Sequence, residues 1–302
     1  MRIEVVTVPY RYDQHLDGSG RGAQVLIDEG LLDKLGKAGI DVSGIRESAL
    51  EDDERVDRSI AVNIGRLGAH TASHVAAALE EQDGVLVLAG DDTAMVGVVS
   101  GVQQRLGAGV RLGLVWLDAH GDFNTPDTSF SGILAGMPVA ILAGLAGPLW
   151  RGAAGLAAPI PTDRIVLAGV RMLDDRENTL LQSTDVRVIS SRDAIAGTVY
   201  RYAIERLADA CDVLCVHVDL DVLDPSLVPS SATPEPNGLT VAQAASLVRD
   251  ALATGKVRVV SVAGLNPGGG KLGQVSVASA TGLIVETIPA WSSPEPDADA
   301  IA

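Results

Sequence analysis

The sequence has too little basic charge to offset its acidic residues, and this deficit excludes several kinds of partner. Its 302 residues contain 39 Asp and Glu but only 23 Lys and Arg, which gives a formal net charge of −16. Nucleic acids and anionic membrane surfaces attract basic proteins. We therefore expect this chain to bind no nucleic acid and no membrane.

Long apolar runs and cysteines are also scarce, and a leader segment is not expected. No apolar stretch approaches the about 18 residues of a membrane span, and residues 1–10 begin with a strand-like run rather than a signal peptide. The two cysteines, Cys211 and Cys215, lie in an apolar segment, where small core residues in a reducing compartment are expected. These features predict a cytoplasmic protein.

What the chain does contain is a series of short apolar runs separated by helix-like segments. The runs are continuously apolar, as in strands of a sheet that is covered on both faces. They span 3–8, 59–65, 84–91, 112–120, 164–171, 186–190, 213–221 and 257–266, and the helical segments span 71–82, 93–107, 197–210 and 240–255. This alternation predicts an α/β fold with a parallel sheet of about eight strands and right-handed crossovers.

The chain has no internal repeat and no linker that would divide it. Residues 1–290 are therefore expected to form one domain. Residues 291–302 are acidic and contain proline, and they are expected to form a disordered tail.

Ligand-type side chains collect where three of these apolar runs end. They are Asp91 and Asp92 after 84–90, Asp118, His120 and Asp122 after 112–117, and Asp219 and Asp221 at the end of 213–221. Residues at alternate positions of an extended backbone point to the same side, and ligands of open α/β sheets bind at the carboxyl ends of the strands. We expect these side chains to meet at one site.

So many carboxylates at one edge would repel each other and raise each other's pKa unless cations neutralised them. A carboxylate-rich set with one imidazole suits Mn²⁺, although other divalent ions such as Ni²⁺ remain possible. Two ions that share carboxylates would activate water for hydrolysis.

Three segments that carry these residues resemble the signature segments of the arginase (ureohydrolase) family. They are AGDDTA (89–94), DAHGDFNTPDTSFSGILAGMP (118–138) and HVDLDVLDPSLVPSSATPEPNGLT (217–240). The resemblance covers most of the chain and implies a three-layer α/β/α domain. It also implies a binuclear Mn²⁺ centre that hydrolyses a guanidino group to urea, and family members are often trimers or hexamers.

The resemblance also assigns roles to individual residues. It implies two Mn²⁺ ions held by Asp92, Asp118, His120, Asp122, Asp219 and Asp221, with Asp118 and Asp219 as bridging ligands. The run NTPDTSFSG is similar to arginases rather than to agmatinases. An amino-acid substrate would therefore be bound by Asn124, Ser129, Ser131, Asp174 and Thr233. Asp118 and Asp221 would contribute to catalysis.

Four positions depart from the family pattern. Asp92 stands in place of a histidine ligand, so five carboxylates and one imidazole face two divalent ions with one negative charge in excess. Ala135 replaces a histidine that shuttles protons, and Gly264 replaces a glutamate that binds a guanidinium. His217 replaces a serine.

His217 shares strand parity with Asp219 and Asp221, so its imidazole should face the metal pocket. It could hydrogen-bond Asp92, supply a nitrogen near the metal, or act catalytically in place of the missing proton shuttle; a plain packing role is equally open. The remaining histidines give less reason to expect a functional role. His70 and His74 lie one helical turn apart and are expected to have surface or packing roles, and His15 has no evident partner.

Three functions fit these observations. The first is an Mn²⁺-dependent hydrolase that cleaves the guanidino or modified guanidino group of an α-amino acid, such as arginine or Nω-hydroxyarginine. The hydroxylated guanidine is less basic and would need less from the missing glutamate and proton shuttle. The second is a catalytically silent homologue that binds an amino acid or an active subunit. The third is a hydrolase of another C–N substrate.

Overall fold

Eight parallel strands form the centre of the structure, a computed structural model that describes residues 1–291. In spatial order the strands are β4 (Asp41–Glu47), β1 (Arg2–Val8), β5 (Gly84–Ala89), β10 (Val257–Ala263), β9 (Val213–Asp219), β6 (Leu112–Leu117), β7 (Ile165–Val170) and β8 (Arg187–Ser190). Every neighbouring pair is parallel. A short antiparallel hairpin, β2 (Tyr10–Arg11) and β3 (Gln14–His15), follows β1.

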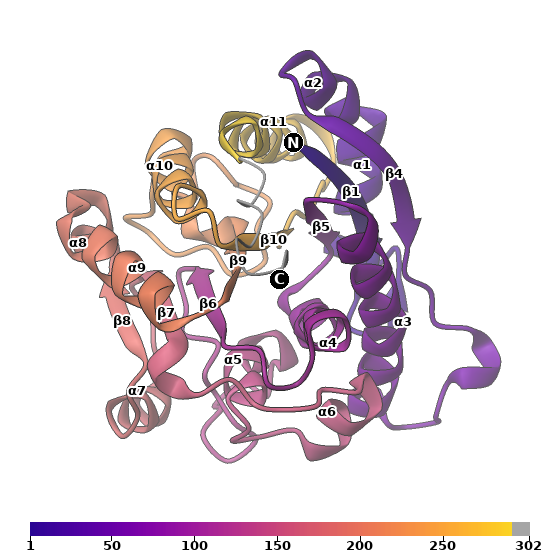
Figure 1. Cartoon of the computed structure of the whole chain (residues 1–302), viewed down its shortest axis with the longest axis vertical. Coiled ribbons are helices and arrows are strands. Elements are labelled where there is room, and N and C mark those ends of the chain that lie inside the picture. Colours follow the sequence, from indigo (N-terminus) through magenta and orange to yellow (C-terminus); the bar gives the residue numbers. More distant parts are fainter. Residues whose placement is uncertain (292–302) are drawn as a thin grey trace, which may run out of the picture.

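Helices cover both faces of this sheet (Figure 1). They are α1 (Gly22–Asp28), α2 (Leu31–Lys37), α3 (Ile60–Glu81), α4 (Met95–Leu106), α5 (Pro138–Leu142), α6 (Pro148–Ala154), α7 (Asp175–Gln182), α8 (Ser191–Ala196), α9 (Thr198–Ala210), α10 (Val241–Leu252) and α11 (Gly270–Thr287). Successive residues of β6 alternate between two cores, since Val115 packs with α9 to α11 and Trp116 packs with α3 to α6. The predicted three-layer α/β/α architecture is confirmed.

Seven of the eight expected strands are present, and the prediction for 59–65 is wrong. That segment is the first part of the 22-residue helix α3, which also contains the helix expected at 71–82. Its buried positions include Ile64, Leu67, Thr71 and Val75, and such spacing of three or four residues belongs to a helix. The seven-residue run was too short to show this period.

The eighth strand is β4, which the sequence did not indicate. It lies at the edge of the sheet, and its residues alternate between exposed and half-buried. An edge strand has one partner only and needs no continuous apolar run. Helix α11 was also missed, because its first turns are rich in glycine and small residues.

The order of the strands places the ends of β5, β10, β9 and β6 next to one another in the middle of the sheet (Figure 1). All four strands run in the same direction, so the segments that follow them meet at one edge. This edge carries the ligand-type side chains of the sequence analysis.

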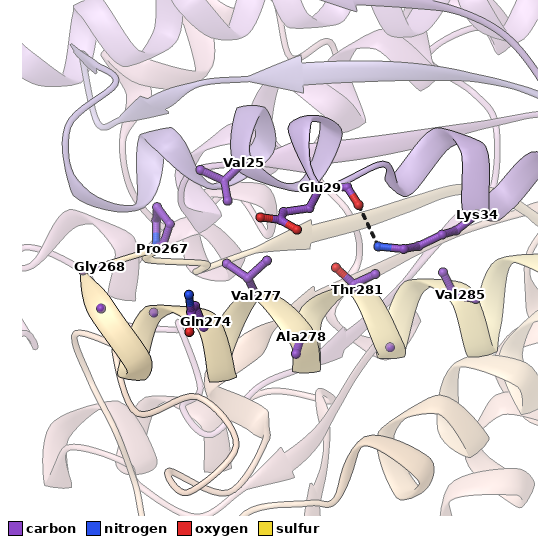
Figure 2. Close-up of a pocket in the computed structure, with 14 residues that line it drawn as sticks. Val25, Glu29, Lys34, Pro267, Gly268, Gln274, Val277, Ala278, Thr281 and Val285 are labelled. Atoms are coloured by element: carbon purple, nitrogen blue, oxygen red, sulfur yellow. Dashed lines mark hydrogen bonds between the residues drawn. The ribbon is translucent and has the colours of Figure 1, made fainter.

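A groove of about 730 Å³ lies away from this edge, between α11 and the α1–α2 segment (Figure 2). Val277 of α11 faces Val25 across it, and Val285 lies farther along α11 near Lys34. Lys34 Nζ donates to the Glu29 carbonyl at 2.7 Å. At the end of the described chain, Trp291 is buried and its indole donates to the Val257 carbonyl at 3.0 Å. The rest of the expected tail, 292–302, lies outside the described residues.

None of the helices within residues 1–291 has the length and apolar character needed to cross a membrane. Cys211 and Cys215 are both buried and free, as expected of small core residues.

Candidate metal centre and substrate cleft

Ligand-type side chains from three strand ends converge into two groups that share Asp118. The first group, here called the histidine side, consists of Asp118, His120 and Asp221. The second, here called the all-carboxylate side, consists of Asp92, Asp118 and Asp122. Within each group one donor atom per residue lies within 4.8 Å of the others. Two adjacent groups with one common carboxylate can hold two cations that share a ligand.

Asp219 belongs to neither group among the described residues, although it lies beside both. It is the last residue of β9, and its Oδ1 accepts a hydrogen bond from the Asp221 backbone N–H at 2.6 Å. The Ala119 backbone N–H donates to Asp221 Oδ1 at 3.2 Å and links the turns after β6 and β9. These bonds hold the two strand ends in register at the site.

The backbone of Asp122 is adapted to place its carboxylate in this cluster. Its φ of 47° lies in the left-handed region, which Asp tolerates better than most residues. Its carbonyl accepts from the Val139 N–H at 3.0 Å, which joins this turn to the start of α5. Its buried Oδ2 has no hydrogen-bond partner among the described residues. A buried carboxylate oxygen without a donor fits a metal ligand.

Crowding and burial raise the pKa of three of these carboxyl groups. Burial, then the charge of Asp221, raises the pKa of Asp118 to about 7. Burial and the neighbouring carboxylates raise the pKa of Asp122 and of Asp219 well above the usual value. Such a cluster favours bound cations, since a cation at the same place stabilises the ionised form.

The imidazole of His120 offsets this repulsion on the histidine side. Its Nδ1 lies 3.1 Å from Asp221 Oδ2 and 3.3 Å from Asp118 Oδ1. Burial acts to lower the pKa of His120, but hydrogen bonds to these carboxylates raise it to about 11. Burial acts to raise the pKa of Asp221, but His120 holds it below the usual value. The same nitrogen, Nδ1, would bind a cation together with these two carboxylates.

His217 contacts the all-carboxylate side from within the sheet. It is fully buried, and its Nε2 lies 3.0 Å from Asp92 Oδ1 while its Nδ1 lies 3.2 Å from Ser261 Oγ. Its ring packs against that of Trp116 at a tilt of 35°, with ring centroids 3.9 Å apart. Of the roles considered for His217, these contacts match a hydrogen bond to Asp92. With Nε2 donating to the carboxylate, Nδ1 accepts from the serine hydroxyl.

Four of the five expected substrate residues line a cavity of about 210 Å³ that also reaches the carboxylate cluster. Asn124 Nδ2 donates to Asp174 Oδ2 at 3.2 Å, which brings the loop after β6 to the start of α7. Glu177 stabilises this arrangement, because its Oε1 accepts from the Phe123 N–H at 2.9 Å and its Oε2 from the Asp174 N–H at 3.1 Å. Asn124 and Asp174 therefore form a fixed polar pair at the cavity.

The other three expected substrate residues differ in their positions. Ser131 lines the cavity, but its Oγ accepts from the Ile133 N–H at 3.3 Å. Ser129 is not among the lining residues, and its Oγ accepts from the Gly132 N–H at 2.9 Å. Thr233 lines the cavity and donates to Asp221 Oδ2 at 2.8 Å, so it orients a carboxylate of the histidine side.

The sequence analysis missed Glu235, which lines this cavity, and Arg171, which supports the loop of Glu235. Glu235 Oε1 lies 3.9 Å from His120 Nε2, and this carboxylate lines the cavity. Arg171 donates to the carbonyls of Asp221 and Glu235 at 2.7 and 3.0 Å, and so fixes the loop on which Glu235 stands. Glu235 was within a quoted segment, but no pattern in one sequence distinguishes it from a surface loop residue.

The remaining histidines lie outside this site. His70 Nε2 lies 2.8 Å from Glu54, and His74 Nε2 lies 3.1 Å from the Glu47 carbonyl. The ring of His15 packs on Tyr10 at 4.9 Å between centroids. These are packing and surface contacts, as expected for His70 and His74.

Comparisons with known proteins agree with this fold and identify its family. The model of the arginase family matches residues 2–288. The arginase of Bacillus caldovelox is 31% identical over 247 residues, which cover 79% of this chain and 82% of that protein. The crystal structure of arginase from Bacillus cereus gives a TM-score of 0.82 at 24% identity and covers 94% of this chain and 97% of that one. The native structure of arginase from Bacillus caldovelox gives 0.80 at 25% identity, with coverage of 94% and 97%.

The fold and the carboxylate cluster define a metal-binding α/β hydrolase. The chain belongs to the arginase family. It is an arginase-like ureohydrolase, a class of hydrolases that act on C–N bonds of amidines.

Proposed function

We propose that the chain hydrolyses the guanidino or modified guanidino group of an α-amino acid to ornithine and urea or a urea derivative, with two Mn²⁺ ions. The observation that carries this proposal is the position of the polar pair Asn124 and Asp174 beside the shared ligand Asp118 in one cavity. A small amino acid can therefore reach the carboxylate cluster with its side chain while its α-groups contact this pair.

The histidine side would hold one ion and the all-carboxylate side the other, with Asp118 common to both. The orphaned Asp122 oxygen and the raised pKa of Asp118 support this assignment. When bound, the ions supply Lewis acidity for the hydrolysis of the guanidino carbon. The preference for Mn²⁺ over other divalent ions follows from the carboxylate-rich set with one imidazole.

The chain's own groups would position the substrate. Asp174 would accept hydrogen bonds from the α-ammonium group, and the Asn124 amide would donate to the α-carboxylate. Glu235 is placed to accept a hydrogen bond from an N–H group of the substrate in the cavity, near His120. Thr233 would keep Asp221 oriented through its 2.8 Å hydrogen bond.

Two positions favour a substrate whose guanidine is weakly basic. Ala135 lines the cavity and offers no proton to a leaving amine, and Gly264 offers no carboxylate to a guanidinium. A desolvated guanidinium needs compensating charge, whereas a hydroxylated guanidine is less basic. We therefore propose Nω-hydroxy-L-arginine as a better substrate than L-arginine.

Ornithine release by the Mn²⁺-loaded protein tests this proposal, with L-arginine and Nω-hydroxy-L-arginine in parallel. Faster turnover of the hydroxylated substrate supports the proposal. Equal or faster turnover of arginine contradicts the substrate preference but not the hydrolysis. Release from neither substrate would contradict the proposal and favour the silent homologue or another C–N substrate. A silent homologue would also bind fewer than two ions per chain.

The amino-acid headgroup is tested separately with Asp174→Asn. We expect the KM for the amino-acid substrate to rise about tenfold or more, because a charged hydrogen bond to the ammonium group is lost. The probe 4-guanidinobutyrate lacks that group, so its KM should not change. Equal changes for both compounds would show that Asp174 acts through folding of α7.

Assembly into a trimer or hexamer and a cytoplasmic location remain predictions.

A further inference from the structure

A second cavity of about 280 Å³ adjoins the substrate cavity at the carboxylate cluster. Both cavities are lined by Asp92, Asp219, Thr233, Ile133 and Ala135. The cluster therefore has open space on two sides. One side leads to the polar pair Asn124 and Asp174, and the other leads to the hairpin β2–β3 and the loop after β10.

This second space exists because two side chains are small. Ala135 lines both cavities with a single side-chain carbon, and Gly264 lines the second cavity without a side chain. Gly264 has a φ of 79°, and a Cβ built on it would overlap the Asp219 carboxylate. The backbone of this loop thus excludes a side chain at 264, and the space is a built feature of the fold.

The lining of this cavity carries the carboxylates of Asp91, Asp92 and Asp219 together with several hydrogen-bond donors. Tyr12 is held there by its N–H, which donates to Asp91 Oδ2 at 2.7 Å, and its ring lies 5.6 Å below the Arg11 guanidinium carbon. Ser19 and Asn266 complete this wall. The Asn266 Oδ1 accepts from the Gly268 N–H at 3.0 Å, which directs the donor end of that amide away from the Gly268 backbone.

The three carboxylates already have donors, since Asp91 accepts from the N–H groups of Tyr12 and Thr93, Asp92 contacts His217, and Asp219 accepts from the Asp221 N–H. The donors of Arg11, Ser19 and Asn266 are therefore left for oxygen acceptors of a ligand.

We propose that this cavity is a subsite for an oxygen-bearing substituent on the terminal guanidino nitrogen of the substrate. The inference rests on the proposed hydrolysis and names its substrate class. A volume of about 280 Å³ exceeds what a hydroxyl group needs, since a water molecule occupies about 30 Å³ of the liquid. The substrate class is therefore an Nω-substituted guanidino amino acid with a substituent of several atoms.

The reaction balances as a hydrolysis. The bond between the guanidino carbon and the side-chain nitrogen breaks, and the water oxygen becomes the carbonyl oxygen of an N-substituted urea. One water proton goes to the side-chain nitrogen to give ornithine, and the other goes to the imino nitrogen of the urea. The substituent stays on the urea, where the subsite would hold it.

Two arginine derivatives with substituents of similar size separate polarity from volume. Nω-Carboxymethyl-L-arginine carries oxygen acceptors, and Nω-propyl-L-arginine carries none. With the Mn²⁺-loaded protein we expect kcat/KM for the carboxymethyl compound to exceed that for the propyl compound at least tenfold. Calorimetric binding of the two compounds should show the same order of Kd, independently of turnover.

Variants of the wall locate the effect. Asn266→Leu and Ser19→Leu should each reduce this tenfold preference to threefold or less. Gln24→Leu, which replaces an exposed amide on α1, is the matched control and should retain it. The use of two wall variants keeps the test valid if one of them does not fold.

The outcomes distinguish the subsite from the hydrolysis. If arginine or its hydroxylated form is hydrolysed but the carboxymethyl compound shows no preference in rate or Kd, the subsite is overturned and the function stands. If the carboxymethyl compound binds with dependence on Asn266 but no substrate is hydrolysed, the subsite stands and the proposed function fails. If nothing binds and nothing is hydrolysed, both are overturned.

Discussion

The histidine side and the all-carboxylate side of the cluster share Asp118 but balance their negative charge differently. On the histidine side the imidazole of His120 contacts both carboxylates, and the pKa of Asp221 stays below the usual value although burial acts to raise it. On the all-carboxylate side no member is basic, and burial and repulsion raise the pKa of Asp122. The all-carboxylate side therefore depends more on a bound cation.

His217 partly offsets this imbalance. Asp92 accepts from its Nε2 at 3.0 Å, so a nitrogen donor lies behind the carboxylate rather than among the ligands. The family resemblance places a histidine at position 92. The chain therefore keeps an imidazole near this group but uses it to orient a carboxylate.

The largest expected effect comes from the residue that the two sides share. Asp118→Asn removes a charged ligand from both groups, so we expect both ions to be lost and kcat/KM to fall by about 10³-fold or more. Metal content per chain, measured by atomic absorption, and ornithine release check this. Asp127→Asn in the exposed loop after β6 is the control. Retention of two ions in Asp118→Asn would contradict the shared-ligand assignment.

A change on one side only should remove one ion. Asp122→Asn preserves the left-handed backbone, because Asn tolerates a φ of 47° as Asp does. We expect metal content to fall from two ions to one and kcat/KM to fall about 10²-fold. Metal analysis and kinetics on the same sample measure both. Loss of both ions would mean that the two sides do not fill independently.

Much of this arrangement could be predicted from the sequence because it depends on local patterns. Asp118, His120 and Asp122 follow an apolar strand at alternate positions, and the strand direction brings them to Asp221. The segment 59–65 was misassigned because a short apolar run fits both a strand and a helix. The sequence also predicts that the substrate site lacks a carboxylate at Gly264, where the family has a glutamate.

Other features of the site depend on contacts between distant loops. The cavity beside Gly264 depends on a left-handed backbone and on the packing of the β2–β3 hairpin against the loop after β10. Glu235 reaches His120 because Arg171 holds its loop through backbone carbonyls. No spacing within one segment reports such contacts, so the second cavity could not be predicted.

A smaller effect is expected from the residue behind Asp92. His217→Ala removes the hydrogen bond to Asp92 and leaves a space under Trp116, whereas His217→Gln retains a donor. Partners that orient metal ligands contribute about 10- to 100-fold in affinity. We expect the Kd of the more weakly bound Mn²⁺ to rise about tenfold in His217→Ala and less in His217→Gln.

The two variants separate positioning from packing. Titration with Mn²⁺ followed by calorimetry gives the Kd of each ion, and thermal unfolding reports any loss of packing. Equal Kd values in the wild type and in His217→Ala would show that the imidazole has only a packing role. An equal effect in both variants would show that the donor does not matter.

The last expected effect concerns stability rather than metal binding or activity, and is a pH dependence of folding in the metal-free protein. The pKa of Asp118 rises from 3.8 to about 7 on folding, so the folded chain binds more protons than the unfolded chain between these values. The free energy of unfolding should therefore fall as pH rises from about 4 to about 7, on the order of 1 kcal/mol per unit of pKa difference. The raised pKa of His120 changes the number of bound protons on folding only above a pH of about 6.5, so His120 does not oppose this trend at lower pH.

Urea unfolding of the metal-free protein at several pH values checks this trend. In Asp122→Asn the fall should be shallower, because one carboxyl group with a raised pKa is absent. Saturating Mn²⁺ should stabilise the wild type more at pH 7 than at pH 5, since a cation binds the ionised carboxylates. A free energy of unfolding that rises with pH in the metal-free wild type would contradict the crowding of these carboxylates. It would also remove the physical reason for the difference between the two sides.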